Sequence, residues 1–105
     1  MHPGLEQVEL SHVLHALSDP TRLAIVCALA HGSERTCGQF DLGLSKATWT
    51  HHFRVLREAG LTRTRIEGKH RYISLRRDEI DQRFPDLLAS VLRNAHPPVP
   101  DLIRS

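Results

Sequence analysis

The spacing of apolar residues predicts two helices in the first third of the chain. The first covers residues 5–17, where leucine and valine recur at i, i+3, i+4 and i+7, at Leu10, Val13, Leu14 and Leu17. The second runs from Pro20 to His31 and is apolar nearly all round, which is typical of a helix at the centre of a core. Asp19 can cap it, and Pro20 suits its first position because no N–H is needed there. We expect Arg22 to be a partly buried cation that pairs with a carboxylate.

A helix predicted over residues 45–59 carries an apolar stripe and a basic stripe. The apolar stripe follows the helical period at Trp49, Phe53 and Leu56. The basic stripe holds Lys46, Thr50, Arg54 and Arg57. Ser45 is a suitable N-cap, and Gly60 suits the left-handed residue that ends a helix. Such a helix fits the major groove of DNA, although an ordinary solvated surface helix can have the same pattern.

The residues before this helix predict the first part of a helix-turn-helix. Gly32 ends the core helix, and residues 36–42 are expected to form one or two helical turns with Phe40 and Leu42 facing inward. Gly43 and Leu44 then make a tight turn. A short helix, a turn containing glycine and a helix with a basic outer face together predict a helix-turn-helix.

Residues 61–75 change from a helical to a strand period. Two runs rich in β-branched and aromatic residues flank a turn with Gly68 at its tip, which predicts a two-stranded hairpin. Its tip and flanks carry four side chains that can be positive: Arg65, Lys69, His70 and Arg71. A hairpin directly after a recognition helix is a wing, whose cations can reach a phosphate or the minor groove. Because two strands alone are marginally stable, we expect the wing to lean on the core through Ile66, Tyr72 and Ile73.

The last predicted helix starts at Pro85, after one turn near residues 78–82, and runs to about Ala95. It carries a strong apolar stripe at Leu87, Leu88, Val91 and Leu92. With the first helix, this stripe can contact a second subunit; alternatively, it closes the core of a single chain. The predicted fold is mainly α with a two-stranded wing, in the order α-α-α-α-β-β-α. One domain covers residues 1–96, and residues 97–105 form a proline-rich tail that we expect to be poorly ordered.

The charge is divided unevenly along the chain. Residues 45–77 hold nine of the fourteen Lys and Arg residues and two of the twelve acids, so this segment carries +7 and the remainder −5. A basic part joined to an acidic part is typical of a protein that meets a polyanion with one face. No apolar run approaches the roughly 20 residues that span a bilayer, and the N-terminus does not read as a secretory signal. Two cysteines make no disulfide framework, so a reducing cytoplasm is expected.

The order of elements resembles the ArsR/SmtB family of winged-helix repressors over residues 8–93. The most specific parts are Leu17-Ser-Asp-Pro-Thr-Arg22, Leu56-Arg-Glu-Ala-Gly-Leu61 and Gly68-Lys-His-Arg-Tyr72. The resemblance implies a homodimer that binds an inverted-repeat operator in double-stranded DNA and is released by an inducer. Matched by position, the helix would contact DNA through Lys46, Thr48, Thr50, His51 and Arg54, and the wing through Arg65, Lys69 and Arg71. With the capping Ser45 and the wing's His70, these are the candidate DNA-binding residues.

The inducer is not identified by the sequence. Neither metal pattern of the family is met, since Cys37 lacks a paired cysteine and the last helix lacks paired ligands, so no metal or other cofactor is expected. His12 and His15 lie about one turn apart and are weak metal candidates. Cys27 and Cys37 could form a redox or persulfide switch, although Cys27 is most simply a small core residue. A small organic inducer, or none, is equally open.

Two functional classes remain. The first is a sequence-specific DNA-binding regulator, predicted to be a repressor. The second is a winged-helix module that binds a protein and lacks specific DNA binding. No constellation of nucleophile, base and acid suggests an enzyme. A protein-binding module usually lacks the basic stripe and the wing cations, so their presence favours DNA.

Overall fold

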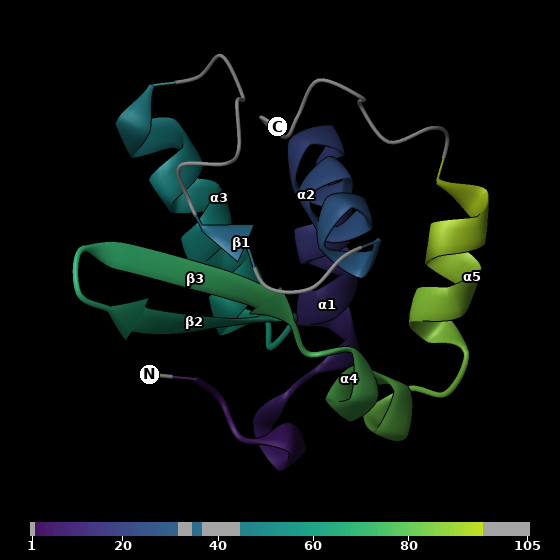
Figure 1. Ribbon diagram of the computed structural model, residues 1–105. Coiled ribbons are helices and arrows are strands. Elements are labelled where there is room, and N and C mark those ends of the chain that lie inside the picture. Colours follow the sequence, from purple (N-terminus) through teal and green to yellow (C-terminus); the bar gives the residue numbers. More distant parts are fainter. Residues whose placement is uncertain (1, 32–34, 37–44, 96–105) are drawn as a thin grey trace.

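A computed structural model describes residues 2–31, 35–36 and 45–95 (Figure 1). The elements in chain order are η1 (Leu5–Gln7), α1 (Leu10–Leu17), α2 (Pro20–Ala30), β1 (Arg35–Thr36), α3 (Lys46–Glu58), β2 (Thr62–Glu67), β3 (His70–Leu75), α4 (Arg77–Arg83) and α5 (Leu87–Asn94). Together they form a winged helix, which is the predicted fold class.

Helix α2 forms the centre of the core, as its apolar surface predicts. In Figure 1 it lies between α3 and α5, and Ile25 and Val26 on it are fully buried. Pro20 is in the first turn, and the Asp19 carboxylate accepts a hydrogen bond from the backbone N–H of Arg22 at 3.0 Å. This side chain satisfies one of the amides that the first turn leaves unpaired.

The N-terminal prediction of one helix from residue 5 is wrong. A 3₁₀ turn at Leu5–Gln7 is followed by extended backbone at Val8, and α1 begins only at Leu10. The helix is interrupted because Val8 is 2% exposed, packed in the core beside the end of α3. The predicted apolar stripe of α1 is also only half buried, since Leu10 and Leu14 are 45% and 47% exposed.

The predicted hairpin is present, but it belongs to a three-stranded sheet. Its strand order is β1-β3-β2 and both pairings are antiparallel, with Thr64 opposite Ile73 and Arg65 opposite Tyr72. The added strand β1 contains Thr36, which pairs with Tyr72. The expectation that Thr36 begins a helix is therefore wrong, because its backbone extends the sheet. The rest of that predicted helix, at 37–42, lies outside the described residues, as does the predicted tail at 97–105.

The C-terminal helices begin and end slightly differently from the prediction. The expected turn at 78–82 is the longer helix α4, and α5 starts at Leu87, after Asp86 with a φ of 68°. Leu88 is fully buried. The other apolar residues of α5 are partly buried against the same core, at Leu87, Val91 and Leu92. Much of this stripe thus contributes to the core of its own chain.

The end of α3 is joined to β2 by a tight turn at Gly60. Gly60 has a φ of +88°, in the left-handed region that glycine adopts without steric cost. A β-carbon built there would lie 2.5 Å from a methyl carbon of Val8. The backbone N–H of Leu61 then donates to the Leu56 carbonyl at 3.0 Å. This turn fixes the direction in which the wing leaves α3.

We predict that Gly60→Ala lowers the free energy of unfolding by about 3 kcal/mol, from the left-handed backbone and the contact with Val8 together. Gly68→Ala is the matched control, because Gly68 has a φ of +60° with nothing within 4 Å of an added β-carbon. Gly68→Ala should lower the free energy of unfolding by about 1 kcal/mol, because only the left-handed backbone is strained. Urea unfolding of both variants measures the difference. Equal losses would show that the approach of Val8 does not constrain this turn.

Candidate nucleic-acid interface

The N-terminus of α3 is capped by the residue that the sequence predicts. The Ser45 hydroxyl accepts a hydrogen bond from the backbone N–H of Thr48 at 3.2 Å. The two hydroxyl oxygens, of Ser45 and Thr48, lie 2.8 Å apart. Both residues are exposed, so a ligand can reach the end of the helix where the unpaired amides gather.

The inner face of α3 holds it on the core. Leu56 is fully buried, and the rings of Trp49 and Phe53 meet edge to face with centroids 5.1 Å apart. On the rest of the helix surface, the predicted contact residues are exposed at Lys46, Thr48, Thr50, His51 and Arg54. The predicted apolar and polar stripes are therefore both present.

Helix α3 and the wing enclose a cleft of about 780 Å³, which we call the helix–wing cleft. In Figure 1 the hairpin crosses the lower part of α3, and residues of α3 contact β2. The helix lines the cleft with Lys46, Thr50, Arg54 and Arg57. The wing lines it with Lys69, His70 and Arg71. The basic side chains of the two elements thus gather on one side of the molecule. Among the described residues, no ion pair involves Lys46, Arg54, Lys69 or Arg71.

Arg57 is a cleft residue that was not among the candidate DNA contacts. It is partly buried, and its Nε has no hydrogen-bond partner among the described residues. The signal was in the sequence, since Arg57 continues the basic stripe of Lys46, Thr50 and Arg54. This Nε is itself buried, so only the part of the Arg57 side chain that lines the cleft can meet an anion there.

The two faces of the wing separate its cations. Register places Arg71 on the face that carries Thr64 and Ile73 and lines the cleft. Arg65 is on the opposite face, where its guanidinium is 4.5 Å from the centroid of the Tyr72 ring and pairs with Glu67. The structure therefore does not bring Arg65 into the cleft with the other candidates.

The wing rests on the core through fewer residues than predicted. Ile73 is 2% exposed, and Tyr72 is half-buried. Ile66, however, is 68% exposed, so its expected core contact is wrong. Ile66 lies opposite Arg71 near the tip of the hairpin, beyond the reach of the core.

Side chains from other elements hold the base of the wing. Glu79 of α4 accepts hydrogen bonds from Arg63 of β2 at 2.7 Å and from Arg76 at 2.6 Å. Arg76 also donates to the Pro3 carbonyl at 2.9 Å, and His2 Nε2 accepts from the Thr64 backbone N–H at 2.9 Å. The hydrogen bond from Arg76 holds the pKa of Glu79 below its usual value, and burial lowers the pKa of His2.

Arg22 is buried as expected, but its partners are not carboxylates. Its guanidinium donates to the carbonyls of Ala16 and His15 at 2.7 and 3.3 Å, and Nη1 lies 3.2 Å from Nδ1 of His52. The expectation of a carboxylate partner is wrong, because carbonyls at the end of α1 take the hydrogen bonds of the guanidinium. As predicted, His52 points into the protein while His51 is exposed.

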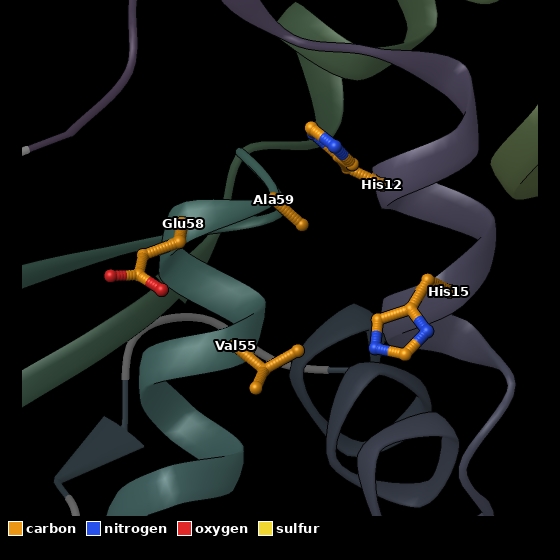
Figure 2. Close-up of a pocket in the computed structure, with 5 residues that line it drawn as sticks. All are labelled: His12, His15, Val55, Glu58 and Ala59. Atoms are coloured by element: carbon orange, nitrogen blue, oxygen red, sulfur yellow. The ribbon is translucent and has the colours of Figure 1, made fainter.

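Among the described residues, the candidate inducer residues line separate hollows, His12 and His15 in one and Cys27 in another. Cys27 is buried on α2, and burial raises the pKa of its thiol, which leaves little reactive thiolate. Cys37 lies outside the described residues. Figure 2 shows His12 and His15 on α1 beside a hollow of about 350 Å³, whose far wall is formed by Val55, Glu58 and Ala59 of the α3 end. Within the described residues, no three His, Cys, Asp or Glu side chains could hold a metal ion.

Comparisons with known proteins give the family. A family model described as a helix-turn-helix domain matches residues 17–65. The chain is 39% identical over 84 residues to the uncharacterized HTH-type transcriptional regulator YceK of Bacillus subtilis, covering 77% of this chain and 84% of that one. A crystal structure of an ArsR family transcriptional regulator matches with a TM-score of 0.63 and 26% identity, over 77% of this chain and 89% of the other. The chain belongs to the ArsR family.

A further relative agrees with this assignment. The biofilm growth-associated repressor of Agrobacterium fabrum is 35% identical over 91 residues, covering 83% of this chain and 77% of that protein. The family resemblance, the winged-helix fold and the function of a DNA-binding transcriptional regulator are thus confirmed for this ArsR family chain. No single described helix is long and apolar enough to cross a membrane; α1 and α2 pass that test only as a pair bent by 100°.

We predict that Glu79→Gln removes a stability term that depends on pH. Because the folded-state pKa of Glu79 is below its ordinary value of 4.5, the carboxylate stabilises the fold above that pH and ceases to do so as the pH falls through the lower value. The difference in free energy of unfolding between the two proteins should be constant near neutral pH and shrink below about pH 4.5. Glu67→Gln, at the exposed wing tip, controls for the change in net charge. A difference that persists unchanged in acid would contradict this role of Glu79.

Proposed function

We propose that this chain is a homodimeric, sequence-specific repressor that acts in the cytoplasm. Recognition helix 45–59 enters the major groove, while wing 61–75 contacts the flanking backbone or minor groove. The observation that carries the proposal is the helix–wing cleft, where cations from both elements lie on one side of the molecule. A duplex bound there would neutralise them with phosphates, and counterion release would favour binding.

The contact residues have different roles in this proposal. Lys46, Thr50, His51 and Arg54 read base edges or nearby phosphates, because they are exposed on α3. Ser45 and Thr48 present the helix N-terminus to a phosphate. Lys69, His70, Arg71 and the added Arg57 contact the backbone around the cleft. Arg65 has a smaller role, since it lies on the other face of the wing and already pairs with Glu67.

A second copy is proposed to pack against α1 and α5. Leu10 and Leu14 support this, because two adjacent leucines of one helix are about half exposed. A twofold dimer would place two recognition helices about 34–36 Å apart, one turn of DNA, on an inverted repeat. Repression is supported by relatives such as the biofilm growth-associated repressor.

We also propose that an inducer releases the protein from DNA, and several chemical classes of inducer remain candidates. A small molecule, a thiol-reactive compound and a metal remain candidates. The raised pKa of Cys27 argues against a reactive thiolate there. His12 and His15 would need a further ligand, such as one from the second subunit.

The alternative is a winged-helix module that binds a protein partner. It is the weaker reading, because such a module has no use for cations that line both walls of a cleft without ion pairs in the described chain. Binding to duplex DNA at increasing salt separates the two, since contacts to several phosphates must weaken steeply with salt.

We predict that Lys46→Ala and Thr50→Ala relax sequence preference, each costing about 1–3 kcal/mol on a preferred duplex. Arg71→Ala should weaken binding to all duplexes alike and reduce the salt slope by about 1. Fluorescence anisotropy measures these effects, using a duplex enriched from a random pool by the unmodified protein and an unselected duplex. Arg65→Ala is the control on the wing, and it should lose less affinity for DNA than Arg71→Ala. Unchanged binding in all three test variants would overturn this docking mode.

We predict that Leu14→Glu shifts the dimer toward a monomer, because it places a charge in the proposed apolar contact. Ile66→Glu adds the same charge at the exposed wing tip and should leave the dimer intact. Sedimentation velocity distinguishes the two species. Both variants remaining dimeric would show that α1 is not at the subunit interface.

A further inference from the structure

The side chain of His52 links the recognition helix to the corner between α1 and α2. It is 12% exposed, and its Nδ1 lies 3.2 Å from Nη1 of Arg22. Arg22 is 7% exposed and belongs to the first turn of α2. The contact joins residues 30 positions apart in the sequence. It is a polar contact beside the apolar packing of Trp49, Phe53 and Leu56.

The guanidinium of Arg22 is fixed before it meets His52. Its Nε donates to the Ala16 carbonyl at 2.7 Å and its Nη2 to the His15 carbonyl at 3.3 Å. Its own backbone N–H is held by Asp19. Because the guanidinium is planar, these hydrogen bonds determine where Nη1 points. The donor offered to α3 therefore has a set position and direction.

Chemistry determines the state of His52 in this contact. A guanidinium carries only donors and stays protonated, so Nδ1 must offer a lone pair. His52 is then the neutral tautomer with its proton on Nε2. The charged or titratable groups around it are Arg22, the Asp19 carboxylate at 4.0 Å and, on its own helix, His51, whose ring centroid is 5.9 Å away.

We infer that His52 is a positioning residue for DNA recognition, resting on the proposed docking of α3 in the major groove. Its hydrogen bond from Arg22 fixes the rotation of α3 about its own axis. A rotation of roughly 10° moves a side chain about 6 Å from the axis by about 1 Å. Base-edge hydrogen bonds require donor–acceptor distances of about 2.7–3.2 Å, so such a shift breaks them. Phosphate contacts from long side chains tolerate it better.

Three substitutions at His52 test this inference. His52→Asn keeps an acceptor close to the position of Nδ1, His52→Gln carries its acceptor one bond further out, and His52→Leu has none. Asn and His have similar helix propensities, so a change in helix formation does not explain the outcome. The readout is the ratio of affinities for the enriched duplex and the unselected duplex, measured at one salt concentration.

We expect His52→Leu and His52→Gln to lower this ratio about tenfold, which is the discrimination that one base-edge contact supplies. His52→Asn should keep the ratio within about threefold of that of the unmodified protein. Binding to the unselected duplex should change little in all three. Val55→Ala, a partly buried neighbour of His52 one turn further along α3, is the control for general loosening. If His52→Leu does not fold, the Asn and Gln pair alone decides.

An unchanged ratio in His52→Leu, equal losses in Asn and Gln, or an equal loss in Val55→Ala would each overturn the inference. Thr50→Ala in the same assay separates failure of the positioning role from failure of the proposed docking mode. If Thr50→Ala lowers the ratio and the His52 variants do not, only the positioning role fails. If Thr50→Ala has no effect either, the proposed docking itself fails.

Discussion

The left-handed turn at Gly60 is the constraint on which the basic face of the molecule depends. Val8 packs directly against the position where any other residue would carry a β-carbon. The recognition helix therefore ends at a fixed place, and β2 leaves it in a fixed direction. The backbone N–H of Arg76, after the hairpin, returns to the carbonyl of Leu61 at 2.8 Å. Helix and wing thus behave as one unit, with their cations on a common side.

Charge is handled differently on the two sides of this unit. At the base of the wing, Glu79 pairs with Arg63 and Arg76, and these cations hold the sheet on α4. In the cleft, Lys46, Lys69 and Arg71 have no carboxylate partner among the described residues. Unneutralised cations on neighbouring elements repel one another, a cost that phosphates of a bound duplex would relieve. The same residue type thus supports the fold at one end and stays open to a ligand at the other.

Polar contacts near the recognition helix connect the interface to the core. Arg22 donates to the carbonyls at the end of α1 and directs one Nη1 donor at His52. His51, the preceding residue, is exposed to solvent. Adjacent histidines thus meet two different environments, because successive helical residues are about 100° apart. His52 makes a buried hydrogen bond, and His51 stays accessible to a ligand.

The sequence by itself determined what depends on local pattern and chemistry. Helical period predicted α2 and α3, hairpin pattern predicted β2 and β3, and Asp19 and Ser45 were found as caps because capping involves residues close in sequence. The tertiary structure alone decided which residues distant in sequence meet. It paired Thr36 with Tyr72 and turned Arg22 toward carbonyls and His52. It also buried Val8 at the cost of a longer first helix, because packing free energy exceeds local helix propensity.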